Sequence, residues 1–235
     1  MKIKGAVVFV TGANRGIGLA FAREALSKGA IKVYAGMRKT EGFSEAGMIP
    51  VQIDVTKPES IRRAAAQCGG VTILVNNAGI AELVSGALDD RVEAVTKAMM
   101  EVNLFGIVRV TQAFAPVLAA KPQSAIINVL SDVSWKATPI LTPYSASKAA
   151  AWSYTNHARM ALKEQNTSVV GLHVGFVDTD LTAGVDVPKS DPRVVARKSY
   201  DVLEAGGAEV LADEGTVKLK ASLSAARPEY IYPEA

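Results

Sequence analysis

Tyr144 and Lys148 are the two side chains whose types and spacing best suit proton transfer in this sequence. They stand four residues apart, and residues at i and i+4 share one face of a helix, so both can point into one cleft. A free phenol titrates near pH ~10, and a neighbouring ammonium favours the phenolate and lowers that pKa. A lower pKa would bring the phenol closer to the working range of a general acid. The same spacing also arises by chance on surface helices, so the pair needs a cofactor and a substrate site beside it.

Residues 11–18, Thr-Gly-Ala-Asn-Arg-Gly-Ile-Gly, form a glycine-rich segment directly after the first apolar run of the chain. Glycine permits a tight turn and lets the backbone approach a pyrophosphate closely. The helix that follows would offer free N–H groups and a partial positive charge to an anion. A plain strand-to-helix turn would also use glycine, but the position between a buried strand and a helix favours dinucleotide binding.

The residues after the second apolar run indicate which dinucleotide would bind. An NAD site usually has an acidic residue here for the ribose 2′-hydroxyl. This chain has Arg38 and Lys39 instead, Glu41 lies beyond the strand end, and Arg15 adds a positive charge in the glycine-rich segment. Exposed basic residues are often merely solvated, but guanidinium groups suit a 2′-phosphate, and their placement at both positions favours NADP(H) over NAD(H).

Short apolar runs rich in Val and Ile alternate with longer helical patterns, and these elements must position the site. We expect strands at Ala6–Val10, Ile31–Ala35, Ile49–Ile53, Val71–Val75, Ala125–Leu130 and Val169–Val174. We expect helices at Gly18–Ser27, Pro58–Gln67, Asp89–Ala119 (with a break near Asn103) and Pro143–Gln165. The alternation predicts a doubly wound parallel sheet, Rossmann-like, with three layers α/β/α and six to seven strands.

The C-terminal part is less regular. Helices are expected at 193–205 and 213–224, and a short last strand at 230–233. The segment 181–195 is rich in turn-forming residues, and we expect a substrate loop at about 181–200. Together with the segments 80–90 and 132–142, this loop would read the substrate. The apolar side chains of Phe176, Trp135, Ile140 and Leu141 hint at a pocket for an aryl or alkyl group.

The bulk composition narrows the class of protein. The 235 residues suit a single α/β domain, 1–235, and the net charge of +3 without a Lys/Arg run argues against nucleic acid as a partner. The first apolar run is too short for a signal peptide, and no apolar run reaches the length of a membrane span, so we expect no membrane partner. The single cysteine, Cys68, fits a reducing compartment, and we expect a cytoplasmic protein.

The motif Thr-Gly-x-x-x-Gly-x-Gly, together with Asn76-Asn77-Ala78-Gly79 and Tyr-x-x-x-Lys, resembles the short-chain dehydrogenase/reductase family, in its single-domain branch and NADP-preferring carbonyl reductase type. The resemblance is dense over residues 5–180. It also covers Ser131, which stands thirteen residues before Tyr144, the separation usual in that family. The resemblance implies NADPH-dependent reduction of a ketone or aldehyde to an alcohol, a small-molecule carbonyl as partner, and NADP(H) as the cofactor.

The resemblance also implies a role for individual residues. Ser131 would hydrogen-bond the carbonyl oxygen, Tyr144 would donate the proton, and Lys148 would lower the tyrosine pKa and bind the nicotinamide ribose. Asn103 would support an ordered water behind Lys148, although it could also simply break or cap a helix. The residues implied in cofactor binding are Gly12, Asn14, Arg15, Gly16, Ile17, Gly18, Arg38, Asp54, Val55, Asn77, Ala78, Gly79, Tyr144, Lys148, Gly175, Val177 and Thr179.

The chain departs from the family pattern in two places. Val174-Gly175 stands where the family commonly has Pro-Gly, and the tail does not read as the usual glycine-rich seventh strand. The helices expected at 103–119 and 143–165 resemble the pair that forms the family's dimer, so we expect a homodimer, with a homotetramer as the alternative. His173 lacks a second ligand, and we expect no metal site.

Two rival functions remain open at the level of sequence. A dinucleotide sensor that has lost its chemistry could dispense with Ser131, Tyr144 or Lys148, yet all three are present. An epimerase or dehydratase of the extended branch would need a larger C-terminal domain and a different glycine spacing. The site residues, more than the fold, favour the reductase.

Overall fold

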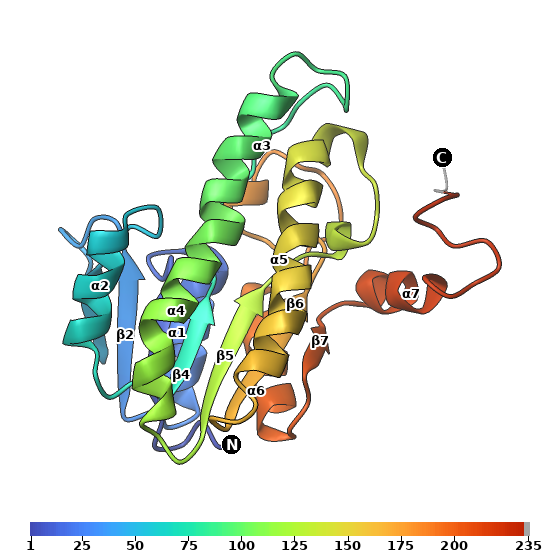
Figure 1. Cartoon of the computed structure of the whole chain (residues 1–235). Helices are drawn as coiled ribbons and strands as arrows, with labels where there is room; N and C mark the ends of the chain where they lie inside the picture. The colour runs from blue at the N-terminus through green and yellow to red at the C-terminus, as the bar shows by residue number, and fades with distance from the viewer. Residues whose placement is uncertain (233–235) are drawn as a thin grey trace.

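The computed structural model describes residues 1–232, and its strands form one seven-stranded sheet in the order β3-β2-β1-β4-β5-β6-β7, with every pair parallel (Figure 1). The strands are β1 Val7–Thr11, β2 Lys32–Met37, β3 Met48–Gln52, β4 Ile73–Asn76, β5 Ser124–Val129, β6 Thr167–His173 and β7 Glu209–Leu211. The doubly wound parallel sheet expected from the sequence is therefore confirmed. The six strands that we expected match the observed ones within a few residues, and β7 is a seventh.

β1 illustrates why unbroken apolar runs become central strands. Val8 and Val10 point into one core cluster and Phe9 into the other, and all three are fully buried. A strand covered on both faces by helices has no solvent side, so it shows no polar alternation. β2 and β4 lie on opposite sides of β1, so the strand order changes direction at this point. In such sheets, ligands bind in the crevice at the carboxyl ends of these strands.

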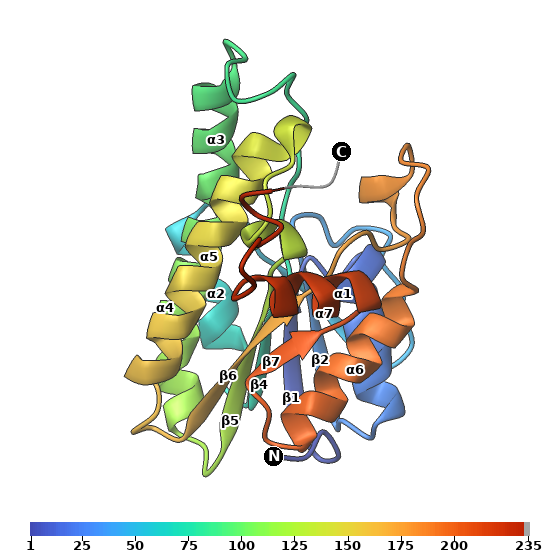
Figure 2. The same ribbon diagram turned by 90° about the vertical axis from the view of Figure 1, so that its right-hand side faces the viewer.

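Helices cover both faces of the sheet, with α1 and α6 on one face and α2, α4 and α5 on the other (Figures 1 and 2). α3 and the start of α5 rise beyond the carboxyl ends of the strands (Figure 1). The helices are α1 Gly16–Ser27, α2 Pro58–Gln67, α3 Val92–Met100, α4 Gly106–Ala119, α5 Thr142–Ala161, α6 Pro192–Glu204 and α7 Glu214–Ser222.

α3 and α4 form one continuous helix joined by a π-helical turn, η1, at Glu101–Phe105. The break expected near Asn103 is thus a local widening of the helix rather than a separation into two, and such turns often occur at functional sites. By length and composition alone, the segment Val92–Ala119 could cross a membrane. Core helices of soluble proteins pass the same test, and the inner face of α4 packs on the sheet through Val110, Phe114 and Leu118.

The C-terminal part differs from the expectation in two respects. The last strand is β7, and residues 230–232 form a turn; Pro233, the last residue of the expected strand, lies outside the described residues. The expected loop 181–200 ends at Asp191, which caps α6 through the Arg193 N–H, and Pro192 occupies the first turn. The helix expected at 193–205 is therefore confirmed as α6. The loop itself contains a short 3₁₀ turn, η4, at Asp180–Thr182.

Candidate active site

The glycine-rich segment forms a tight loop between β1 and α1. Gly12 and Gly16 have φ angles of +67° and +55°, in the left-handed region that favours glycine. A Cβ on Gly18 would collide with the carbonyl oxygen of Gly12 and lie 2.5 Å from Nδ2 of Asn77. No side chain among residues 1–232 caps the N-terminus of α1, and its first turn has no acidic residue. The loop and the helix therefore fit a dinucleotide phosphate.

The ends of β1 and β4 are joined beneath this loop. The Thr11 hydroxyl accepts the N–H groups of Asn77 and Ala78 at 2.9 and 3.0 Å and donates to the carbonyl of Val75 at 3.3 Å. Nδ2 of Asn77 donates to the carbonyls of Thr11 and Gly12, at 2.9 and 3.2 Å. These bonds fix the floor of the crevice at the point where the sheet changes direction.

The side chains expected at the adenosine end lie at the carboxyl ends of β2 and β3. Arg38 and Lys39 are exposed, whereas Arg15 forms an ion pair with Asp180 at 2.8 Å. This pair links the glycine loop to the start of η4. Asn14 is exposed beside Arg15, and Ile17 is half-buried in the first turn of α1.

Asp54 and Val55 follow β3 and have different surroundings. Burial acts to raise the pKa of Asp54, but hydrogen bonds from Thr56 and the charges of Arg38 and Lys57 outweigh it and lower that pKa. Val55 is buried under η1 and α4. A Cβ on Gly106 would lie 2.9 Å from Cγ2 of Val55, so this valine also sets how closely the long helix approaches the site.

Asn103 lies in the π-helical turn and is fully buried. Its amide pairs with the backbone of Ile80 in both directions at 2.9 Å, and its Nδ2 also lies 3.0 Å from the Ser147 hydroxyl. A Cβ on Gly79 would lie 3.2 Å from Oδ1 of Asn103 and 3.8 Å from Nζ of Lys148. The side chain therefore connects the segment after β4 with α5, beside Lys148.

Ser131, Tyr144 and Lys148 meet where β5 ends and α5 begins. Nζ of Lys148 lies 5.6 Å from the centre of the Tyr144 ring and donates to the carbonyl of Val129 at 2.8 Å. Lys148 is 4% exposed, and burial lowers its pKa to about 8. Ser131 is buried beside Tyr144, and its hydroxyl acts to lower the pKa of Tyr144.

The pKa of Tyr144 differs from the expectation. Burial raises it above its usual value, the charge of Asp132 raises it further, and the Ser131 hydrogen bond opposes both only in part. The ammonium of Lys148 does not offset these effects in the protein alone. Loss of hydration therefore sets the direction of this pKa in the protein alone. The lowering of the Tyr144 pKa by Lys148 stays a prediction for the complex with the cofactor.

The segment after β6 closes the other side of the crevice. The N–H of Gly175 donates to Oδ2 of Asp213 at 2.9 Å, and Val177 is buried and bridges to Ser190. A Cβ on Gly16 would lie 3.3 Å from Cγ2 of Thr179, so this segment reaches the glycine loop. Valine in place of the usual proline thus leaves the segment folded against the crevice.

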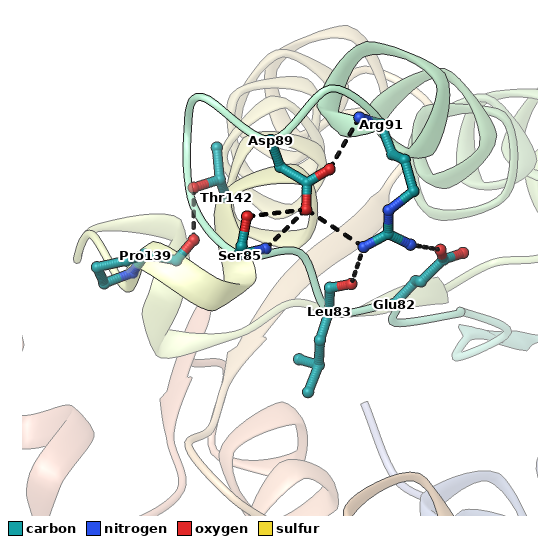
Figure 3. Close-up of polar contacts among 7 residues, drawn as sticks. All are labelled: Glu82, Leu83, Ser85, Asp89, Arg91, Pro139 and Thr142. Atoms are coloured by element: carbon teal, nitrogen blue, oxygen red, sulfur yellow. Dashed lines mark hydrogen bonds and ion pairs between the residues drawn. The ribbon is translucent and has the colours of Figure 1, made fainter.

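The outer rim consists of the loop after β4 and the short 3₁₀ turn η3 at Pro139–Leu141. The carboxylate of Asp89 accepts hydrogen bonds from Ser85 and Arg91 and holds the loop in shape (Figure 3). The N–H of Val84 donates to the carbonyl of Ile140 at 3.1 Å, which ties the loop to η3. The segments 80–90 and 132–142, two of the three that we expected to contact the substrate, therefore touch each other.

Three polar residues contribute to this region without having been selected from the sequence. Thr11 belongs to the glycine motif, and its place at the end of a buried strand was the available signal. Ser147 bridges Asn103 to the carbonyl of Tyr144. Asp132 directly follows Ser131, and an acidic residue beside a predicted catalytic serine was its signal.

Trp135, which we expected at an apolar substrate pocket, is 8% exposed, and its ring stacks on the His173 ring with 3.8 Å between the ring centres. It therefore does not line an open pocket.

Two curated relatives resemble this chain over most of its length. Dehydrogenase/reductase SDR family member 7B of Mus musculus is 30% identical over 232 residues, which cover 87% of this chain and 71% of that protein. Estradiol 17-beta-dehydrogenase 2 of Mus musculus is 32% identical over 216 residues, covering 85% of this chain and 56% of that protein. The chain therefore spans just over half the length of the latter.

Solved structures agree with the fold and with the kind of ligand. A short chain dehydrogenase from Burkholderia cenocepacia J2315 in complex with NADP has a TM-score of 0.91 and 38% identity, covering 97% of this chain and 96% of that one. The NADPH-bound carbonyl reductase from chicken fatty liver has a TM-score of 0.77 and 29% identity, covering 85% and 91%. A Burkholderia phymatum short chain dehydrogenase/reductase in complex with NAD has a TM-score of 0.84, but its 21% identity supports the fold alone.

Residues 6–189 match the family described as short chain dehydrogenase. This match covers more than half of the chain, and it includes the glycine loop, the Ser131–Tyr144–Lys148 cluster and the segment after β6. The chain belongs to the short chain dehydrogenase family, whose members are oxidoreductases that bind a nicotinamide dinucleotide.

Proposed function

We propose that this protein catalyses the NADPH-dependent reduction of a ketone or aldehyde to an alcohol. The observation that carries the proposal is the convergence of Ser131, Tyr144 and Lys148 at the end of the crevice that begins at the glycine loop. When bound, the reduced nicotinamide supplies the hydride. The remaining requirements are an oriented carbonyl, a proton donor and a dry site, and side chains of this chain are suited to each.

Ser131 would orient the substrate by donating to its carbonyl oxygen, where negative charge grows as the carbon is reduced. Tyr144 would deliver the proton from its hydroxyl to that oxygen. A phenol whose pKa lies above its usual value keeps its proton across the neutral range, which suits a proton donor. The Lys148 ammonium, buried beside the ring, would stabilise the phenolate left after transfer.

Cofactor preference is proposed from charge. Arg38 and Lys39 are exposed at the end of β2, and the Arg38 charge reaches the Asp54 carboxyl. A 2′-phosphate at this edge would meet a guanidinium, whereas a 2′-hydroxyl would find no acidic partner on β2. The 38% identity with the NADP-bound Burkholderia cenocepacia structure supports the same preference.

The substrate proposed is an apolar aryl or alkyl carbonyl compound. Phe176 and Ile140 are 40% and 49% exposed on the segments that border the site, and the buried side chain of Val84 packs with Tyr144 on the rim. Apolar side chains around a few polar groups are typical of small-molecule sites. Trp135, which stacks on His173 within the protein, does not contribute to this surface.

A panel of aryl and alkyl ketones, with NADPH consumption as the readout, tests the activity. Tyr144→Phe should lower kcat by about 10²–10⁴-fold, because the variant lacks the proton that the hydroxyl transfers. NADPH binding, followed by cofactor fluorescence, should stay near the wild-type value. Tyr34→Phe on β2 is the matched control and should retain activity.

The outcomes separate the rival functions. NADPH binding without turnover of any carbonyl compound would favour the dinucleotide sensor over the reductase. Normal turnover by Tyr144→Phe would show that this tyrosine is not the proton donor. The proposed reductase activity itself would still stand.

A further inference from the structure

Asp132 lies directly against the serine that we propose to orient the substrate. The Ser131 hydroxyl donates to Oδ1 of Asp132 at 3.0 Å, and the same oxygen accepts the Val133 N–H at 2.8 Å. The carbonyl of Val174 lies 3.3 Å from the hydroxyl as a second acceptor. A serine hydroxyl has one proton. When that proton is held by a carboxylate, which accepts stronger hydrogen bonds than a neutral carbonyl, it is not available to a substrate oxygen.

A second carboxyl group, that of Asp213 at the N-cap of α7, faces the same point. A Cβ on Gly175 would lie 3.6 Å from Oδ2 of Asp132 and 3.7 Å from Oδ2 of Asp213. Asp213 is held by the Gly175 N–H at 2.9 Å and by the N–H and hydroxyl of Thr216, both at 2.8 Å. Three donors therefore hold the Asp213 carboxyl in place beside Asp132.

These surroundings act on the protonation of Asp132 in opposite directions. Burial raises its pKa most, the hydrogen bonds from Ser131 and Val133 lower it, and the charge of Asp213 raises it again; the net direction is upward. Lys136 opposes the shift more weakly, and its ammonium is also paired with Glu229 at 2.5 Å.

The other titratable groups around this point are Tyr144 on α5, Lys148 on α5 and His173 on β6. The Asp132 charge raises the pKa of Tyr144, and Lys148 is bonded to the Val129 carbonyl. Nδ1 of His173 lies 3.1 Å from the carbonyl of Ser131, and burial lowers the pKa of His173 to about 4. This histidine is therefore neutral where the enzyme would work and adds no charge beside Asp132.

We propose that Asp132 is a positioning residue that decides whether the Ser131 hydroxyl can reach a substrate carbonyl, and that reduction proceeds in the form with Asp132 protonated. The inference rests on the proposed function. In the ionised form, the carboxylate holds the serine proton and opposes the negative charge that grows on the carbonyl oxygen. In the protonated form, the carboxyl becomes a donor and leaves the serine proton free for the substrate.

The first test compares the pH dependence of kcat for ketone reduction in the wild type and in Asp132→Asn. The amide keeps an oxygen for the Val133 N–H but cannot ionise. Wild-type kcat should fall by about tenfold per pH unit above the pKa of Asp132, while Asp132→Asn should lack this decline until Tyr144 itself titrates. Asp201→Asn, which changes an exposed acid on α6, should follow the wild-type profile.

Asp213→Asn gives an independent prediction for the same group. Removing the neighbouring charge should move the decline in kcat toward lower pH, because the pKa of Asp132 falls when a like charge is lost. The amide oxygen can still accept the Thr216 N–H, so the cap of α7 is preserved. A residue that merely supported the fold would lower kcat at every pH without moving the profile.

The second readout does not need turnover. In protein labelled with ¹³C at aspartate carboxyl groups, the resonance lost in Asp132→Asn identifies Asp132. Its titration should lie above the ordinary aspartate pKa of ~3.9 and should move down in Asp213→Asn. The proposal would be overturned if kcat had the same pH dependence in the wild type and in Asp132→Asn. It would also be overturned if the pKa of Asp132 were ordinary and did not change in Asp213→Asn. Absence of any ketone turnover with normal NADPH binding would instead overturn the proposed function. The ¹³C titration would still show whether the charge of Asp213 raises the pKa of Asp132.

Discussion

At the scale of single residues, Lys148 is an ammonium group placed where water cannot reach it. It is 4% exposed, and the Val129 carbonyl is its nearest acceptor, at 2.8 Å. Burial lowers its pKa from 10.5 to about 8, so the folded protein binds this proton less tightly than the unfolded chain. The unfolded state therefore holds more protons between these two values, and the free energy of unfolding should increase as the pH rises through this window.

Lys148→Met should remove that dependence. The wild type should gain stability, relative to the variant, between about pH 8 and 10.5, with a full contribution on the order of 3 kcal/mol across the shift. Urea unfolding at several pH values measures it, with Lys163→Met as the control because Lys163 is exposed. Parallel curves for the wild type and Lys148→Met would show that Lys148 titrates normally in the folded protein.

Arg38 permits a residue-scale test of cofactor choice. Arg38→Asp removes a charge at the end of β2 and supplies an acceptor for a ribose 2′-hydroxyl. The KM for NADPH should rise by about tenfold or more, since a hydrogen bond to a charged group contributes roughly 1.5–3 kcal/mol. The KM for NADH should fall. Arg63→Asp on α2 is the control, and an unchanged NADPH preference would assign the phosphate to another group, such as Lys39.

At the scale of elements, the approach of α1 to the end of β1 depends on one missing side chain. A Cβ on Gly18 would meet the Gly12 carbonyl oxygen and Nδ2 of Asn77, and backbone cannot move aside as a flexible side chain does. Gly18→Ala should lower NADP(H) affinity at least tenfold and reduce the melting temperature, because α1 must shift from the phosphate loop. Gly69→Ala, where a Cβ meets nothing within 4 Å, should leave both unchanged. Wild-type cofactor affinity in Gly18→Ala would mean that the loop does not hold the phosphate.

The elements also show which features the sequence could predict. Strands such as β1 are predictable because burial on both faces demands an unbroken apolar run. β7 was missed because three residues are too few to show a period. The helix expected at 193–205 matches α6, Pro192–Glu204, within one residue at each end, because Asp191 and Pro192 mark its N-terminus.

The same limit applies to the site. Tyr144 and Lys148 were predictable because both belong to one helix, where spacing alone fixes their common face. The contact of Arg15 with Asp180 joins residues 165 positions apart, and no local pattern encodes it. Asp132 and Asp213 meet at Gly175 only because β6 and β7 are neighbours in the sheet. The effect of Asp213 on Asp132, and of Asp132 on Tyr144, therefore had to come from the structure.

At the scale of the whole molecule, α4 and α5 lie side by side on one face and present an outer surface to solvent (Figure 1). Small or apolar side chains occupy part of that surface, among them Ala149, Ala150 and Trp152, which are half-buried, and Met160, which is 76% exposed. An apolar surface of this kind is a frequent sign of a protein–protein interface. It agrees with the homodimer expected from the sequence, which we retain as a prediction.

Ser153 is an exposed residue in the middle of α5, and an arginine there would place a long charged side chain between two closely packed copies of the helix. We expect the wild type to have about twice the chain mass of 24.7 kDa by light scattering, and Ser153→Arg to have the mass of one chain. The fold should persist, because the substitution touches no core residue. Ser27→Arg makes the same change at an exposed serine of α1, on the opposite face of the sheet, and should remain dimeric. A wild type with the mass of one chain, or a dimer unaffected by Ser153→Arg, would show that α4 and α5 do not form the subunit contact.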